Sequence, residues 1–204
     1  MEQLTARDSQ KLATRRRVLD AARDLFDEIG YDDTTIRAIA GRAGVSVGSV
    51  FTTFTSKDDI LSQVMLDRLD SLHGELQSVL PHLRGSTADR CRSLFAVHYA
   101  FEMRRVKLFL AHIAASYSWR NQPSTVPFGR NALLRGMLVE GLRKGVERGD
   151  VRPDVDPHMV VDLLMAAYAW NYRLAADEGA DSERLTALMD RQIGVIFEGV
   201  SVRA

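Results

Sequence analysis

The stretch that decides the fold of this chain is TTIRAIAGRAGVSVGSVFTTF, residues 34–54. Its apolar residues recur at intervals of three and four, which is typical of short helices with one buried face. Thr34 or Thr35 can cap a first helix, Gly44 can end it, and Ser46 can cap a second one. The stretch therefore predicts two short helices joined by a tight turn.

Small side chains at Ala40 and Ala43 would let these two helices pack closely. Stacked on a preceding helix, such a pair forms a helix-turn-helix, whose second helix enters the major groove of DNA. Val47, Gly48 and Ser49 would then point at base edges. A generic helical hairpin has similar caps and a similar turn glycine, so the spacing alone leaves both interpretations open.

The same helical spacing continues through the rest of the chain, with no sustained alternation of period two, and predicts an all-α protein. All five prolines lie after residue 80, and Pro81 with the turn at residues 85–87 suggests a domain boundary. The further helices that we expect are residues 9–29, one that Ser56 caps, 88–103, 105–120, 128–148, one that begins near Pro157, and one that starts after Ser182.

Composition excludes several classes of protein. The chain has 204 residues with 27 basic and 27 acidic side chains, which excludes a polycation held to nucleic acid by bulk charge. Its single cysteine, Cys91, excludes a disulfide framework. No segment resembles a signal peptide or a membrane span, so we expect a cytoplasmic protein with no membrane partner. Residues 34–57 nevertheless contain three basic residues and no acidic one, and this local charge suits DNA.

Residues 30–61, GYDDTTIRAIAGRAGVSVGSVFTTFTSKDDIL, resemble the N-terminal domain of TetR-family transcriptional regulators. The positions that match are Gly30-Tyr31, Thr34-Thr35, Ile39-Ala40, Ala43 to Ser46, Gly48, Phe54 and Ser56-Lys57. The rest of the chain matches that family's ligand-binding and dimerisation domain in size and class only. The resemblance thus implies a helix-turn-helix DNA-binding domain over residues 1–56, with its motif at about 34–54, and a helical effector-binding and dimerisation domain over 57–204.

The resemblance also implies a function. It indicates a ligand-responsive repressor, with neither enzymatic activity nor a cofactor, that binds a palindromic operator in double-stranded DNA as a homodimer. A small apolar or aromatic effector would release it. The positions implied to contact DNA are Thr34, Thr35, Arg42, Ser46, Val47, Gly48, Ser49, Phe51, Thr53 and Lys57, with Arg15, Arg16 and Arg17 as further candidates.

Two of these positions depart from the family pattern. Phe51 stands where a tyrosine is usual, so it has no phenolic hydroxyl to offer a phosphate, and a core aromatic is its more frequent role. Thr53 stands where histidine or tyrosine is common, and its side chain is shorter. Both changes are expected to weaken DNA binding and to leave the fold intact.

Aromatic residues gather in the second half of the chain, where they could line an effector pocket or form an ordinary core. The candidates for the pocket are Phe95, Tyr99, Phe109, His112, Trp119, Met137, Met165 and Tyr168. Residues 159–172 are apolar nearly all round and must be covered on several sides. The resemblance implies that the last two helices form the dimer interface, through Leu163, Ala167, Trp170, Leu185, Leu188, Met189, Ile193, Ile196 and Phe197.

Two alternatives from other classes stay open. His98 and Glu102 are four residues apart and could bind a metal on one helix face, as in a small helical enzyme or metal-binding protein. A helical ion pair explains the same spacing. The other alternative is a helical carrier whose N-terminal domain no longer reads DNA, because of Phe51 and Thr53.

Overall fold

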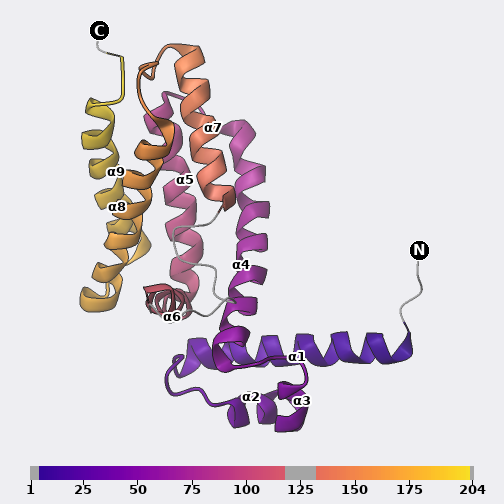
Figure 1. Ribbon diagram of the computed structural model, residues 1–204. Helices are drawn as coiled ribbons and strands as arrows, with labels where there is room; N and C mark the ends of the chain where they lie inside the picture. Colours follow the sequence, from indigo (N-terminus) through magenta and orange to yellow (C-terminus); the bar gives the residue numbers. More distant parts are fainter. Residues whose placement is uncertain (1–4, 118–131, 203–204) are drawn as a thin grey trace. The chain divides into compact units, whose positions relative to one another are not determined.

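The computed structural model describes residues 5–117 and 132–202, and its helices follow the expected order (Figure 1). The α-helices are α1 (Ala6–Glu28), α2 (Ile36–Ala43), α3 (Val47–Phe51), α4 (Lys57–Val79), α5 (Thr87–Glu102), α6 (Val106–Tyr117), α7 (Ala132–Arg148), α8 (Pro157–Glu178) and α9 (Ser182–Glu198). Within the described residues the only β pairing is an isolated bridge between Val151 and Ser201. The prediction of an all-α fold is confirmed.

The short helices α2 and α3 begin and end where their sequence requires. The Thr35 hydroxyl accepts the Ala38 backbone N–H at 3.1 Å, and the Ser46 hydroxyl accepts that of Ser49 at 3.0 Å. Gly44 ends α2 with a φ of 66°, a left-handed conformation that glycine adopts without strain. These caps and this turn confirm the predicted pair of helices.

The chain divides into two compact units. The first unit contains the chain up to Leu69 together with α6, and the second contains Asp70–Arg104 together with α7, α8 and α9. The expected boundary at residue 56 thus falls short of the observed one. The first turns of α4 belong to the first unit because Ile60, Leu61 and Val64 are buried in its core.

In the first unit, α1 packs against α2 and α6, and α2 packs against α3. Large apolar side chains from these helices and from the segment after α3 are removed from water and supply most of the stabilisation. They include Val18, Phe26, Ile39, Val50 and Phe54. This core holds α3 at the surface of the unit.

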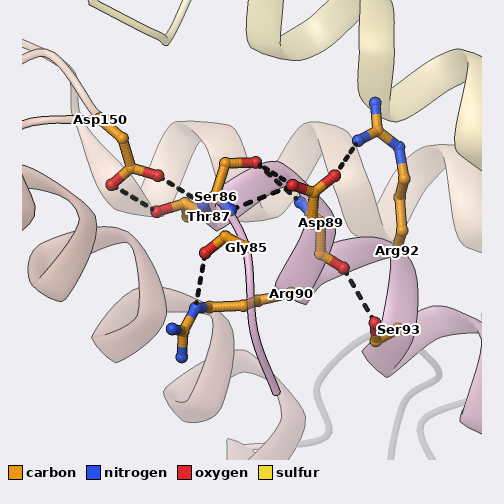
Figure 2. A network of polar contacts seen from close by, with 8 residues as sticks. All are labelled: Gly85, Ser86, Thr87, Asp89, Arg90, Arg92, Ser93 and Asp150. Carbon is orange, nitrogen blue, oxygen red and sulfur yellow. Dashed lines mark hydrogen bonds and ion pairs between the residues drawn. The ribbon is translucent and has the colours of Figure 1, made fainter.

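In the second unit, α5 packs against α7 and α9, and α8 packs against α7 and α9. A network of polar contacts joins the start of α5 to Asp150, which follows α7 (Figure 2). The Asp150 carboxylate accepts the Thr87 backbone N–H at 2.5 Å and the Thr87 hydroxyl at 3.1 Å. A side chain at Gly145 would place its Cβ 2.3 Å from the Thr87 hydroxyl oxygen, so this junction requires glycine.

No helix within the described residues is both long enough and apolar enough to cross a lipid bilayer.

Candidate nucleic-acid interface

Helix α3 exposes apolar side chains on the first unit. Val47 keeps 38% of its surface exposed and Phe51 keeps 56%, whereas Val50 and Phe54 are buried. The interpretation of Phe51 as a core aromatic is therefore wrong, because Val50 and Phe54 fill the core beneath α3. Gly48 adds open space, since a Cβ there would meet only the Ser46 hydroxyl at 3.8 Å.

Thr34 and Thr35 differ in their exposure to solvent and therefore in their access to a DNA phosphate. Thr35 is exposed at the N-terminus of α2, where a phosphate could also meet free backbone N–H groups. Thr34 is buried, and its hydroxyl donates to the Gly30 carbonyl at 2.6 Å. The expectation that Thr34 contacts DNA is thereby corrected, because its side chain holds the turn after α1 and does not face solvent.

Lys57 is engaged within the protein. Its Nζ donates to the carbonyl oxygens of Tyr31 at 2.7 Å, Thr34 at 3.0 Å and Asp32 at 3.2 Å. It also lies 4.2 Å from the centre of the Tyr31 ring. Because an ammonium group has three N–H donors, these carbonyls use all of them. Lys57 thus fastens the connection between α1 and α2, and it could contact a phosphate only by giving up one of these bonds.

Two expected arginines also have partners in the protein. The Arg42 guanidinium donates to both carboxylate oxygens of Glu28, at 3.0 and 2.9 Å, and this hydrogen bonding lowers the pKa of Glu28. Arg15 donates to the Gln63 side chain at 2.5 Å and lies 5.1 Å from the centre of the Phe54 ring. Arg15 therefore faces α4 and the core. Because the Arg42–Glu28 pair is exposed, breaking it so that Arg42 can bind a phosphate would cost little free energy.

A small hollow of about 220 Å³ connects α1 with α3 and the residues after it. Its walls are polar side chains of Gln10, Lys11, Thr14, Ser49, Thr52 and Thr53. Thr53, whose side chain is shorter than the histidine or tyrosine common at this position, lies here with Lys11 close by. Gln10, Lys11, Thr14 and Thr52 were not among the positions expected to contact DNA. The spacing of Lys11 and Thr14, which share a face of α1, is the signal that could have indicated them.

The expected effector-pocket residues are divided between the two units. In the second unit Phe95, Tyr99 and Tyr168 are buried and pack on one another, with ring centres 5.1–5.4 Å apart, as in a core. Met165 is buried in the same unit. Phe109 and His112 belong to the first unit, and Trp119 lies outside the described residues.

Met137 lines an open groove of about 360 Å³ on the second unit. Leu80, Leu83 and Leu94 contribute apolar surface to this groove, and its charged residues are Arg90, Lys144, Arg148 and Glu140, of which Glu140 pairs with Lys144 at 3.4 Å. Apart from Met137, none of these residues was among the expected pocket residues.

The buried part of α5 and α8 contains polar groups that bond to one another. The Asn171 amide donates to the Tyr99 hydroxyl at 3.1 Å and to the Gln192 side chain at 2.7 Å. The His98 ring lies against Tyr168, and burial lowers the pKa of His98 to about 3. The described residues contain no group of three His, Cys, Asp or Glu side chains that could hold a metal, so the metal alternative for His98 and Glu102 gains no support.

The residues expected at a dimer interface fall into three groups. Leu185, Met189, Ile193 and Phe197 form the buried stripe of α9 and pack inside their own chain, which corrects their assignment to an interface. Leu163 and Trp170 on α8 remain 52% and 63% exposed. The other three residues, which are Ala167, Leu188 and Ile196, are half-buried.

Comparisons with known proteins agree with this arrangement of helices. Residues 18–64 match the family described as bacterial regulatory proteins, tetR family. The HTH-type transcriptional repressor KstR2 of Mycolicibacterium smegmatis is 31% identical over 157 residues, which are 76% of each chain.

Two solved structures share the fold over nearly the whole chain. The ketosteroid transcriptional regulator KstR2 of Mycobacterium tuberculosis has a TM-score of 0.64 and 23% identity, and the match covers 93% of this chain and 95% of that one. Thermus thermophilus FadR, a TetR-family repressor in complex with lauroyl-CoA, has a TM-score of 0.69 and 25% identity, with 93% and 96% covered.

Proposed function

This chain belongs to the TetR family of bacterial regulatory proteins, and on that premise we propose that it represses transcription as a homodimer on a palindromic operator, from which a small apolar or aromatic effector releases it. Membership of the family makes the chain a DNA-binding, ligand-responsive regulator and not an enzyme. The dimer, the symmetry of the operator and the chemistry of the effector are our inferences.

The observation that carries DNA binding is the exposed surface of α3. This helix is the second of the helix-turn-helix, its N-terminus is capped by Ser46, and Val47, Gly48 and Phe51 leave it open to a partner. The polar hollow beside it, with Lys11 and Thr14, supplies donors of the kind that bind phosphate oxygens. The same unit thus offers both a base-reading helix and a backbone contact.

The exposed stripe of α8 supports the homodimer. Met159, Leu163 and Trp170 lie three to four residues apart or at multiples of that spacing, and all are exposed in a single chain. Large exposed apolar side chains in a row are typical of an interaction surface. The simplest partner for this stripe is α8 of a second copy of the chain, because the two identical surfaces would pack on each other about a twofold axis. Two copies of α3 would then read half-sites about 34 Å apart.

The effector is proposed to bind the second unit. The lining of the groove beside Met137 combines apolar side chains with three basic residues and one acidic residue, Glu140, and this lining suits a small apolar molecule that carries a polar or negatively charged group. A ligand that binds better to one spacing of the two recognition helices shifts the population toward that spacing. Release from DNA follows when the favoured spacing no longer fits one helical turn.

To test the proposal, the purified full-length chain is used to select duplexes from a random DNA library. The most enriched duplex is then titrated with the protein by fluorescence anisotropy. The proposal expects an enriched inverted repeat that binds one dimer, with its half-sites one helical turn apart. A scrambled duplex of equal composition is the control. Enrichment of no sequence, or binding that is equal for the scrambled duplex, would contradict it.

A further inference from the structure

The recognition helix α3 has an unusual set of side chains for a helix that reads DNA. Its sequence is Val-Gly-Ser-Val-Phe, and it contains no Arg, Lys, Asn, Gln, Asp or Glu. Those six types make hydrogen bonds that identify bases in the major groove, and Arg, Lys, Asn and Gln can each make two such bonds to one base, whereas a Ser or Thr hydroxyl discriminates little between bases. In α3 only the Ser49 hydroxyl could hydrogen-bond a base edge.

The hydroxyl groups near α3 are used locally. The Ser46 hydroxyl accepts the Ser49 backbone N–H at 3.0 Å and lies 2.8 Å from the Ser49 hydroxyl. The Thr52 hydroxyl donates to the Ser49 carbonyl at 2.7 Å. These bonds cap the helix at both ends, so a base edge would have to compete with them.

The large exposed side chains of α3 are apolar. Val47 and Phe51 lie four residues apart and hence on one face of the helix, and both are exposed. The core beneath is filled by Val50 and Phe54, so burial within the chain does not explain the apolar character of Val47 and Phe51. Gly48, between them, adds no side chain that would keep the helix away from the bases.

We propose that Val47 and Phe51 form an apolar patch that reads the C5-methyl groups of thymine in each operator half-site. In the major groove this methyl group is the one apolar feature of a base pair, and Phe is among the side chains that contact it. The inference rests on the proposed function, because it requires α3 to enter the major groove. It predicts half-sites that contain thymine at the positions under α3.

The test removes only the methyl groups. In the duplex selected by the wild-type chain, each thymine is replaced by deoxyuridine, first in one half-site and then in both, and the Kd is measured by anisotropy. We expect the Kd to rise about fourfold for one half-site and about 15-fold for both. These factors correspond to the loss of one buried methyl group from each altered half-site. A wild-type chain that binds both duplexes within twofold overturns the inference and leaves the proposed function intact.

Variants locate the effect on α3. The double variant Val47→Ala with Phe51→Ala should bind the thymine and deoxyuridine duplexes within twofold of each other, and each single variant should reduce the ratio in part. Val146→Ala, which shortens an exposed valine of the second unit, is the matched control and should keep the wild-type ratio. A full deoxyuridine penalty in both single variants would assign methyl reading elsewhere and overturn the inference. If the wild-type chain selects no duplex at all, both the proposed function and this inference are contradicted.

Discussion

Helices α8 and α9 each carry an apolar stripe, yet the two stripes have different surroundings. The stripe of α9, which includes Leu185 and Ile193, is buried against the other helices of its own unit. On α8, Leu163 and Trp170 point to solvent while other apolar residues of the same helix are buried. Helical spacing therefore identifies an apolar face but does not say whether the same chain or a partner covers it.

Two lysines of the first unit show the same difference between a side chain that binds its own unit and one that stays exposed. Lys57 gives all its donors to backbone carbonyls of its own unit, whereas Lys11 is exposed and lines the polar hollow beside α3. Charge in the sequence therefore indicates a DNA contact only where the fold leaves the charged group available.

The largest effect is expected from truncating the buried stripe of α9. Ile193→Ala should lower the free energy of unfolding by about 3 kcal/mol, because it removes buried methyl groups and leaves a cavity. Val195→Ala on the same helix, at a position that is 69% exposed, should change it by less than about 0.5 kcal/mol. Urea titration followed by circular dichroism measures both. Equal losses for the two variants would remove the distinction between the faces of α9.

The next effect concerns the exposed stripe of α8. Trp170→Ala should raise the dimer dissociation constant about 30-fold, roughly 2 kcal/mol, since large aromatic residues dominate interface energies. Arg173 lies 4.7 Å from the Trp170 ring centre and would lose that contact as well. Sedimentation velocity over a range of concentrations measures the change, with Val146→Ala as control. An unchanged dimer would place the interface away from α8.

A third effect, of similar size, is expected for a buried histidine of the second unit. Burial lowers the pKa of His98 to about 3, below the value of about 6.5 in the unfolded chain. The unfolded state therefore binds the extra proton first, and stability falls as the pH drops below about 6.5. Between pH 7 and pH 5 this group alone should cost about 2 kcal/mol of unfolding free energy.

Urea titrations at both pH values measure that loss. His98→Asn should reduce the difference between the two pH values by a corresponding amount, whatever its effect on stability at pH 7. The same difference in the variant and the wild type would show that His98 does not set the acid sensitivity.

The smallest effects separate the two lysines. Lys57→Ala should lower the unfolding free energy by about 1.5 kcal/mol, because three carbonyls lose a charged donor. Lys11→Ala should leave stability unchanged, weaken DNA binding a few-fold and reduce the slope of log K against log salt by about one unit. Thermal melts and anisotropy at several salt concentrations distinguish these results. A stability loss for Lys11→Ala would give this lysine a structural role instead.

The sequence predicted the helix-turn-helix closely because its signals are local. Thr35, Gly44 and Ser46 act through hydrogen bonds and backbone angles within a few residues, and each lies where the caps and the turn were expected. Phe51 was misjudged because its type suggests burial, whereas burial depends on which neighbours fill the core first. Val50 and Phe54 fill it here.

The all-α fold, the positions of the caps and the family could be predicted from the amino-acid sequence, since they follow from short-range spacing and from matched positions. Three further features became visible only in the folded chain: Leu185 and Ile193 belong to the core, Lys57 binds the loop after α1, and Lys11 shares a hollow with α3. Burial and hydrogen-bond partners depend on residues far apart in the chain, and only packing brings those residues together.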